Sequence, residues 1–339
     1  MISELYIVRE LSDLLWAESL WLPENTTWDE LKSTEHIRYP QQTEFWVTPL
    51  FGIAFLAIRI LLESFVFLPI GFLGGWVRTP LAARTFQHLT GGFAGRTKFK
   101  RVAECAWRFC YYTFAWTLGA YVLLDQPQLS NVLTCWIDWP RHHIPDKIFW
   151  YYTIEASYSW SMLYSHLFID VRRKDFYEMV THHAVTLLLL WISWSLNMVR
   201  VGTLVLFSHD AADIFLELGK LMRYAGWQKA LGVVFVVFSI VWAATRFVYY
   251  PFWVVRSVLF DAPGLIRADY RWLNFAQRPM VPRILVVLLS ALVVLHIVWA
   301  GIIVKVAVAS VLYNRKISDS REDESGDEDE RDEEHPHRE

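Results

Sequence analysis

The chain has 339 residues, is 54% hydrophobic and carries a formal net charge of −3 at pH 7. Long uncharged apolar runs recur along it, and about 20 apolar residues match the hydrocarbon thickness of a bilayer. These features exclude an ordinary soluble domain and predict an all-α polytopic membrane protein with about seven transmembrane helices. The helices are expected at residues 45–66, 107–124, 148–168, 179–198, 202–219, 228–250 and 283–312.

The charge is distributed unevenly along the chain. Residues 317–339 contain 12 Asp and Glu against 3 Arg, a net charge of −9, and no aromatic residue. A like-charged segment of this kind cannot build a packed core, so we expect residues 314–339 to form a disordered acidic tail. Ser320 and Ser325 each have an acidic residue three positions on, which favours phosphorylation there. An unmodified, solubilising tail is the alternative.

Loop charge predicts the orientation in the membrane. The connection after the first span is rich in Arg and Lys, which places it in the cytosol. With seven crossings, residues 1–44 form a lumenal N-terminal segment, 45–72 the first transmembrane helix and 73–96 a basic cytoplasmic connection, and the acidic tail is cytosolic. Asn25 begins an Asn-Thr-Thr glycosylation triplet that fits a lumenal N-terminus. The Arg residues in the predicted loop 251–282 oppose this orientation.

Ionisable residues recur inside the predicted spans, where each costs about 2.5–3.5 kcal/mol at the bilayer centre. Arg59 and Glu63 lie four positions apart in the first span and are expected to pair on one helix face. In four later spans, the polar residues share single faces at 3.6 residues per turn. The expected stripes are His182, Thr186, Ser193 and Asn197, with His183 beside them; His209, Asp213, Glu217 and Lys220, with Asp210 at the edge; Tyr152, Glu155, Ser159, His166 and Asp170; and Ser239, Arg246 and Tyr250.

Four consecutive helices that each present a polar stripe predict one shared, partly hydrated cavity. Interhelical hydrogen bonds that only hold the helices together are the alternative. His296, alone in the last span, is interpreted as a packing residue. Paired His and Asp residues on neighbouring spans suit acyl transfer, because a neutral imidazole can act as nucleophile or base and a hydrogen-bonded carboxylate can orient it.

Other chemistries suit the sequence less well. The same His and Asp residues are plausible metal ligands by type, but the HxxxH and HxxHH boxes of membrane di-iron oxygenases are missing from the sequence, and we expect no metal. A proton-coupled transporter would show broken helices and repeat symmetry, and neither is evident. The basic connection is short and Gly-rich, so a membrane surface or an anionic cofactor explains it better than nucleic acid does.

Residues 170–224 resemble the longevity-assurance motif of the ceramide synthases (sphingosine N-acyltransferases), which lies within the TLC domain. The likeness extends over about residues 97–313, which we expect to be the TLC domain, with the last six spans bundled around a central polar cavity. Trp194 and Ala211-Ala212 depart from the family's usual residues, but none of them is a proposed catalytic group. The shared elements are Arg173-Lys174-Asp175-Phe176, His182-His183, Ser193, Asn197, Arg200-Val201-Gly202, His209-Asp210, Asp213, Leu216-Glu217, Lys220 and Tyr224.

The resemblance implies that fatty acyl-CoA, a co-substrate rather than a permanently bound cofactor, donates its acyl group to the amine of a sphingoid base in the endoplasmic reticulum membrane. It implies His182 as acyl carrier or base and His183 as its partner, with Asp210 and Asp213 as catalytic carboxylates. Substrate binding is expected of His209, Ser193, Asn197, Glu217, Arg246 and Glu155, and contact with the CoA moiety of Arg173, Lys174 and Lys220.

Further expected partners are membrane lipids and a second chain, in a homo- or heterodimer, and no nucleic acid. Two alternatives stay open. One is a non-enzymatic TLC-type protein that senses lipids or accompanies the translocon; the other is a metal-dependent membrane lipid enzyme.

Overall fold

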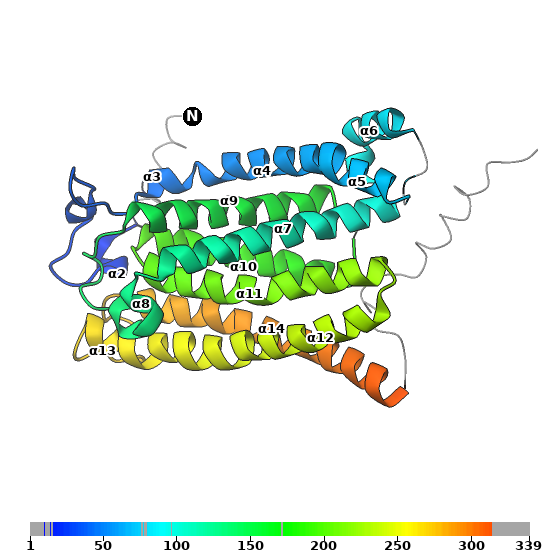
Figure 1. Ribbon diagram of the computed structural model, residues 1–339. Coiled ribbons are helices and arrows are strands. Elements are labelled where there is room, and N and C mark those ends of the chain that lie inside the picture. Colours follow the sequence, from blue (N-terminus) through cyan, green and yellow to red (C-terminus); the bar gives the residue numbers. More distant parts are fainter. Residues whose placement is uncertain are drawn as a thin grey trace, which may run out of the picture.

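The computed structural model describes residues 10, 14, 16–75, 77, 80–95, 97–170 and 172–313. Over these residues the chain is helical and contains no β-strand. Long helices lie side by side in a single bundle, and successive ones run in opposite directions (Figure 1). The acidic tail, with Ser320 and Ser325, lies outside the described residues, so its disorder and phosphorylation stay predictions.

The first predicted span lies within a helical stretch from Gln42 to Leu73. This stretch comprises α3 (Gln42–Phe45), α4 (Thr48–Leu62), the π-helical turn η2 (Glu63–Phe67) and α5 (Leu68–Leu73). η2 comes directly before Pro69 at the start of α5. Because proline has no N–H and crowds the preceding turn, the wider π turn accommodates it inside a continuous helix.

Each of the other predicted spans also coincides with a long helix, although the span 179–198 runs three residues past the end of α10 and 107–124 one residue past the end of α7. These are α7 (Lys98–Leu123), α9 (Asp146–Phe168), α10 (Phe176–Ser195), α11 (Val199–Tyr224), α12 (Gln228–Ala243) with its continuation, and α14 (Val281–Tyr313). Short helices fill the N-terminal segment and the connections: α2 (Glu18–Trp21), η1 (Asp29–Leu31), α6 (Leu81–Leu89), η3 (Gly92–Ala94), α8 (Pro127–Ser130) and η4 (Val132–Cys135).

The prediction of a loop over residues 251–282 was wrong for its first half. α12 continues through π-helical η5 (Ala244–Val255) and η6 (Ser257–Asp261) into α13 (Ala262–Ile266). Pro251 lies inside η5, where the π register again accommodates the missing N–H. Tyr250, Val254 and Val255 pack into the bundle on one side of this stretch, while Phe252 and Trp253 are exposed.

The basic residues of this region pair locally. Arg256 lies 3.4 Å from Asp261, and Arg267 lies 2.7 Å from both Glu24 and Asp269. The charges of Arg256 and Arg267 are therefore balanced by neighbouring carboxylates, and the orientation in the membrane stays a prediction.

Among the described residues, three helical stretches are long and apolar enough to cross a membrane by length and composition: Gln42–Leu73, Gln228–Ile266 and Val281–Ser310. α7, α9, α10 and α11 are 20 to 26 residues long, which also suffices for a crossing. Large apolar side chains on the outer helices are exposed, as expected next to lipid, among them Leu50, Phe65, Val233, Ile240 and Val287. The all-α membrane fold class is confirmed, and the number of seven crossings stays a prediction.

α4 packs along α9 at a point where Gly52 allows close approach. A Cβ atom on Gly52 would lie only 2.7 Å from the Cβ of Trp160, so only glycine fits. Small residues serve this purpose between membrane helices. The predicted pair forms farther along α4, where Arg59 Nε donates to Glu63 Oε1 at 2.8 Å. Lys100 of α7 donates to the same carboxylate at 2.9 Å.

The two ends of the bundle differ. We call the end that carries α6 the α6 end, and the opposite end, which carries α8 and α13, the α8 end (Figure 1). The connection between α9 and α10 lies at the α6 end, and the connection between α10 and α11 lies at the α8 end.

Candidate active site

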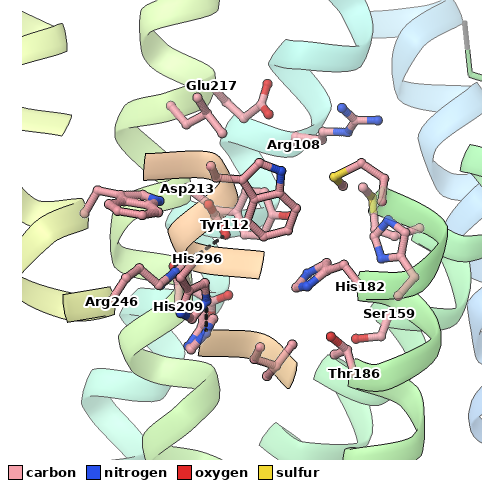
Figure 2. Close-up of a pocket in the computed structure, with 18 of the residues that line it drawn as sticks. Arg108, Tyr112, Ser159, His182, Thr186, His209, Asp213, Glu217, Arg246 and His296 are labelled. Carbon is pink, nitrogen blue, oxygen red and sulfur yellow. Dashed lines mark hydrogen bonds and ion pairs between the residues drawn. The ribbon is translucent and has the colours of Figure 1, made fainter. Parts of the chain in front are cut away.

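A cavity of about 350 Å³ lies between the helices that follow α4. Its described lining residues come from α7, α9, α10, α11, α12, η5, α14 and the connection between α9 and α10, and none of them comes from α4. The lining is charged toward the α6 end, with Arg108, Asp170 and Arg173, and apolar toward the α8 end, with Leu285 and Leu289. The polar stripes thus meet in the shared cavity that the sequence predicts (Figure 2).

The two adjacent histidines of α10 both line this cavity. The ring centroids of His182 and His183 lie 5.4 Å apart. Nδ1 of His182 and Nε2 of His183 are buried and have no hydrogen-bond partner among the described residues. Trp299 of α14 packs edge-on against the His182 ring, with centroids 5.2 Å apart. This contact restrains the ring without using its nitrogen atoms.

His209 of α11 is held by hydrogen bonds on both ring nitrogens. Its Nδ1 lies 2.7 Å from the carbonyl oxygen of Val205, one turn earlier in the same helix. Its Nε2 lies 3.3 Å from Nε2 of His296 on α14. Tyr250 packs edge-on against the His209 ring at 5.2 Å. His209 is therefore a fixed element of the cavity wall, in contrast to the unpaired nitrogens of His182 and His183.

The expected hydrogen bond from Asp210 or Asp213 to a catalytic histidine is not formed among the described residues. Oδ2 of Asp210 and Oε1 of Glu155 on α9 are instead buried without a hydrogen-bond partner among the described residues, and Oε2 of Glu155 accepts a hydrogen bond from Tyr111 at 3.3 Å. Both acids line the cavity, and neither forms a hydrogen bond with a histidine among the described residues.

Arg246 lies in η5, the continuation of α12, and connects this helix to the middle of α11. Its guanidinium donates to the carbonyl oxygens of Ser208 at 3.1 Å and His209 at 3.0 Å, and lies 3.5 Å from Asp213. A guanidinium presents five donors in a fixed plane and can satisfy several acceptors at once. The expected placement of Arg246 and Asp213 at the cavity is observed (Figure 2).

The three residues expected to contact CoA lie toward the α6 end. Arg173 and Lys220 line the cavity, while Lys174 is exposed and is not among its lining residues. Lys220 Nζ donates to Glu217 Oε1 at 2.7 Å. The cationic side chains at the α6 end of the cavity therefore already have anionic neighbours. A phosphate group would have to compete with those carboxylates for the cations.

Asn197 was expected to line the acceptor site, and the structure places it elsewhere. α10 ends at Ser195, and Asn197 adopts a positive φ of 53° beyond the helix. Its side-chain amide donates to the carbonyl oxygens of Pro140 at 2.7 Å and His142 at 2.8 Å. Asn197 therefore anchors the connection before α9. Ser193 does line the cavity, and its hydroxyl donates to the Met198 carbonyl at 2.8 Å.

Among the lining residues that the sequence analysis did not place at the site are His296, Trp299 and Tyr112. His296 was interpreted as a packing residue because it is the sole titratable residue between Arg283 and Lys305. The isolation of His296 nevertheless indicates a role beyond packing, because an imidazole inside an otherwise apolar span is costly. Trp299 lies almost one helical turn beyond His296, on the same face of α14. Nothing in the sequence distinguishes Tyr112 from the aromatic residues around it.

The described residues offer no group of three or more His, Cys, Asp or Glu side chains arranged to hold a metal ion. Metal independence of the reaction stays a prediction. Asn25 is exposed at a turn with a φ of 63°, a position accessible to modification, and its glycosylation also stays a prediction.

The fold and the cavity define a polytopic helical membrane protein with a polar, histidine-containing chamber between its helices. The TLC domain family matches residues 101–305, more than half of the chain. This stretch covers most of α7 to α14 and includes all the described residues that line the cavity except Val306.

Similarity to known proteins gives a finer assignment. The chain is 42% identical to ceramide synthase hyl-2 of Caenorhabditis elegans over 312 residues, which cover 91% of this chain and 93% of the relative. It is 42% identical to ceramide synthase hyl-1 of the same organism, with 86% and 79% covered. Human ceramide synthase 5 is 31% identical, with 93% and 88% covered. The chain therefore belongs to the ceramide synthase family.

Proposed function

We propose that this protein is an N-acyltransferase that moves a fatty acyl group from acyl-CoA to the amine of a sphingoid base, which yields ceramide or dihydroceramide. The names of its relatives support this reaction. The observation that supports it most directly concerns His182 and His183. Each has a buried ring nitrogen without a hydrogen-bond partner among the described residues, and both line a cavity with charged and apolar walls.

His182 can act in one of two ways. As an acyl carrier, a ring nitrogen attacks the thioester carbonyl, the C–S bond breaks and CoA leaves as a thiol after it takes up a proton. The acceptor amine then attacks the acyl-imidazole, and the C–N bond to His182 breaks. As a base, His182 instead takes a proton from the amine while the amine attacks the thioester directly.

His183 and the carboxyl groups support either role. His183 packs against His182 and fixes its position on α10. The carboxyl groups of Asp210 and of Asp213, which pairs with Arg246, lie at the cavity and would supply negative charge there without a direct bond to His182. Charge of this kind stabilises an imidazolium across a low-dielectric space. His209 and Ser193 hold the walls against which an acceptor would lie.

Access for the substrates follows from the asymmetry of the cavity. Arg173, Lys220 and the nearby Lys174 at the α6 end would bind the phosphates of CoA, since Lys and Arg are the usual phosphate ligands. The apolar walls toward the α8 end would hold the hydrocarbon chains. This arrangement requires the α6 end to face the cytosol, as loop charge predicts, with the enzyme in the endoplasmic reticulum membrane. Assembly into a homo- or heterodimer is part of the same proposal.

The test is acyl transfer by purified protein in lipid nanodiscs, with acyl-CoA and sphinganine and without added metal. Mass spectrometry should detect ceramide, and His182→Ala should abolish it. Near-normal transfer by His182→Ala would refute the role of His182. If a metal chelator abolished the formation of ceramide, this would support a metal-dependent enzyme instead. Lipid binding without any product would support a non-enzymatic TLC-type protein.

A further inference from the structure

Two histidines from different helices share a hydrogen bond inside the cavity. Nε2 of His209 on α11 lies 3.3 Å from Nε2 of His296 on α14. Figure 2 shows this pair on the side of the cavity opposite His182. His296 is 1% exposed, and its neighbours along α14 are apolar. A buried imidazole costs desolvation free energy that an apolar residue would not, so this position calls for an explanation beyond packing.

The contacts around the pair fix the proton positions of both rings. A carbonyl oxygen can only accept, so the 2.7 Å contact between His209 Nδ1 and the Val205 carbonyl requires a proton on that nitrogen. Nε2 of a neutral His209 then carries a lone pair, and His296 must donate its Nε2–H to it. The remaining lone pair is on Nδ1 of His296, which is buried without a partner among the described residues.

We infer that His296 and His209 form a proton relay for the amine acceptor, an inference that rests on the proposed acyl transfer. A sphingoid base enters as an ammonium ion, which cannot attack a carbonyl until it loses a proton. The ammonium donates a proton to Nδ1 of His296, and the Nε2 proton of His296 passes to Nε2 of His209. His209 becomes an imidazolium, with its Nδ1 proton still on the Val205 carbonyl.

All the protons of the ammonium group are accounted for over the whole step. The amine nitrogen starts with three protons. One goes to the relay, one goes to the group that leaves the acyl carbon, and one stays on the amide. The products are a neutral amide, a neutral leaving group and one His209 imidazolium, which returns its proton to water when the products leave.

Charged and titratable groups from every neighbouring element act on the relay. Asp210 and Asp213 on α11 favour the imidazolium, whereas Arg246 on η5 and His182 on α10 oppose it. Arg246 is partly balanced by Asp213 at 3.5 Å. Tyr250 on η5 packs against both rings, but its hydroxyl is engaged with the Leu289 carbonyl at 3.0 Å and does not enter the relay.

The test compares two acceptors of equal chain length. Sphinganine carries an ammonium group, whereas an O-alkyl hydroxylamine is unprotonated at neutral pH and does not need the relay. The variant is His296→Gln, because a Gln amide N–H can still donate to His209 but cannot pass a proton on. We expect the rate with sphinganine to fall by at least about a hundredfold, the low end for general acid–base catalysis, and the rate with the hydroxylamine to fall less than about twofold.

The matched control is His142→Gln, which replaces a buried histidine outside this cavity. It should change both rates by the same factor. The relay is overturned if His296→Gln also lowers both rates equally, because a purely structural role affects both acceptors alike. Absence of product with either acceptor in the wild-type protein overturns the acyl transfer itself, and the relay with it.

If His296→Gln does not fold, the relay can still be tested on the wild-type protein, by the pH dependence of the ratio of the two rates. If only the free amine could react, the rate with sphinganine relative to the hydroxylamine would drop about tenfold per pH unit below the pKa of the amine. A relay accepts the ammonium form, so this ratio should stay nearly flat between about pH 8 and pH 7. A tenfold drop per unit would refute the relay without any mutation.

Discussion

The carboxylate of Asp170 lies 3.0 Å from the guanidinium of Arg59. Asp170 follows α9 inside the TLC domain match, whereas Arg59 is on α4 outside it. Asp170 also accepts from Ser165 at 2.8 Å and pairs with Arg108 of α7 at 2.6 Å. Ser165 accepts a further hydrogen bond from Arg59. The first helix is thus tied to the mouth of the cavity by charge as well as by packing.

We expect Asp170→Asn to lower the free energy of unfolding by about 3 kcal/mol, because it leaves two buried guanidinium groups without a full counter-charge. Urea or thermal unfolding in detergent measures this loss. The control is Asp146→Asn, which removes the 79% exposed partner of Arg38. Surface pairs contribute little, so this change should be below about 1 kcal/mol. Equal losses in the two variants would contradict the buried network.

Asn197→Ala distinguishes an anchor from a substrate-binding residue. The substitution leaves the Pro140 and His142 carbonyls without their donor and puts Ala at a φ of 53°. We expect a loss of stability of about 2 kcal/mol with an unchanged KM for sphinganine. Asn197→Gly, which tolerates the positive φ, should recover part of the loss. A raised KM with full stability would instead restore the acceptor-site role predicted from the sequence.

Gly202→Ala should overpack the contact between α11 and its neighbouring helices. A Cβ atom there would lie 2.7 Å from the hydroxyl of Tyr152 and 2.9 Å from that of Ser193. Overpacking of this kind costs about 1–3 kcal/mol, and acyl transfer should fall because both hydroxyl-bearing residues line the cavity. Gly232→Ala on α12 is the matched control, since its Cβ would meet nothing within 4 Å. Thermal unfolding of the two variants in parallel decides the point.

His142 should make stability depend on pH. It lies in the connection before α9, where burial, aided by the charge of Arg200, lowers its pKa from 6.5 to about 3. Below pH 6.5 the unfolded chain therefore binds a proton that the folded chain does not. This contribution to stability is fully present above that pH and is lost toward pH 3, at about 1.4 kcal/mol per unit at most.

The measurement for His142 is the free energy of unfolding at two pH values, one near neutral and one about a unit below the pKa of a free histidine. The wild-type protein should lose more stability between them than His142→Gln does, by on the order of 1 kcal/mol. Identical slopes for the two proteins would show that His142 does not titrate between the folded and unfolded states.

The sequence alone determined the class of fold and the contents of the site. Apolar runs report bilayer-length helices because the hydrocarbon core has a fixed thickness. The 3.6-residue repeat brings His182, Thr186 and Ser193 to one face because helix geometry is local. The stripes of α9, α10, α11 and η5 were therefore predictable as components of a single cavity. The resemblance of residues 170–224 to ceramide synthases also required no coordinates.

Only the tertiary structure decided which groups meet across the cavity. Periodicity fixes the face of each helix but not its axial offset against a neighbour, and an offset of one turn changes every interhelical partner. For this reason neither Asp210 nor Asp213 forms a hydrogen bond with a histidine among the described residues, whereas His296 donates to His209. Asn197 leaves the stripe for a similar reason: two carbonyls of a distant connection, rather than its helical position, determine where α10 ends.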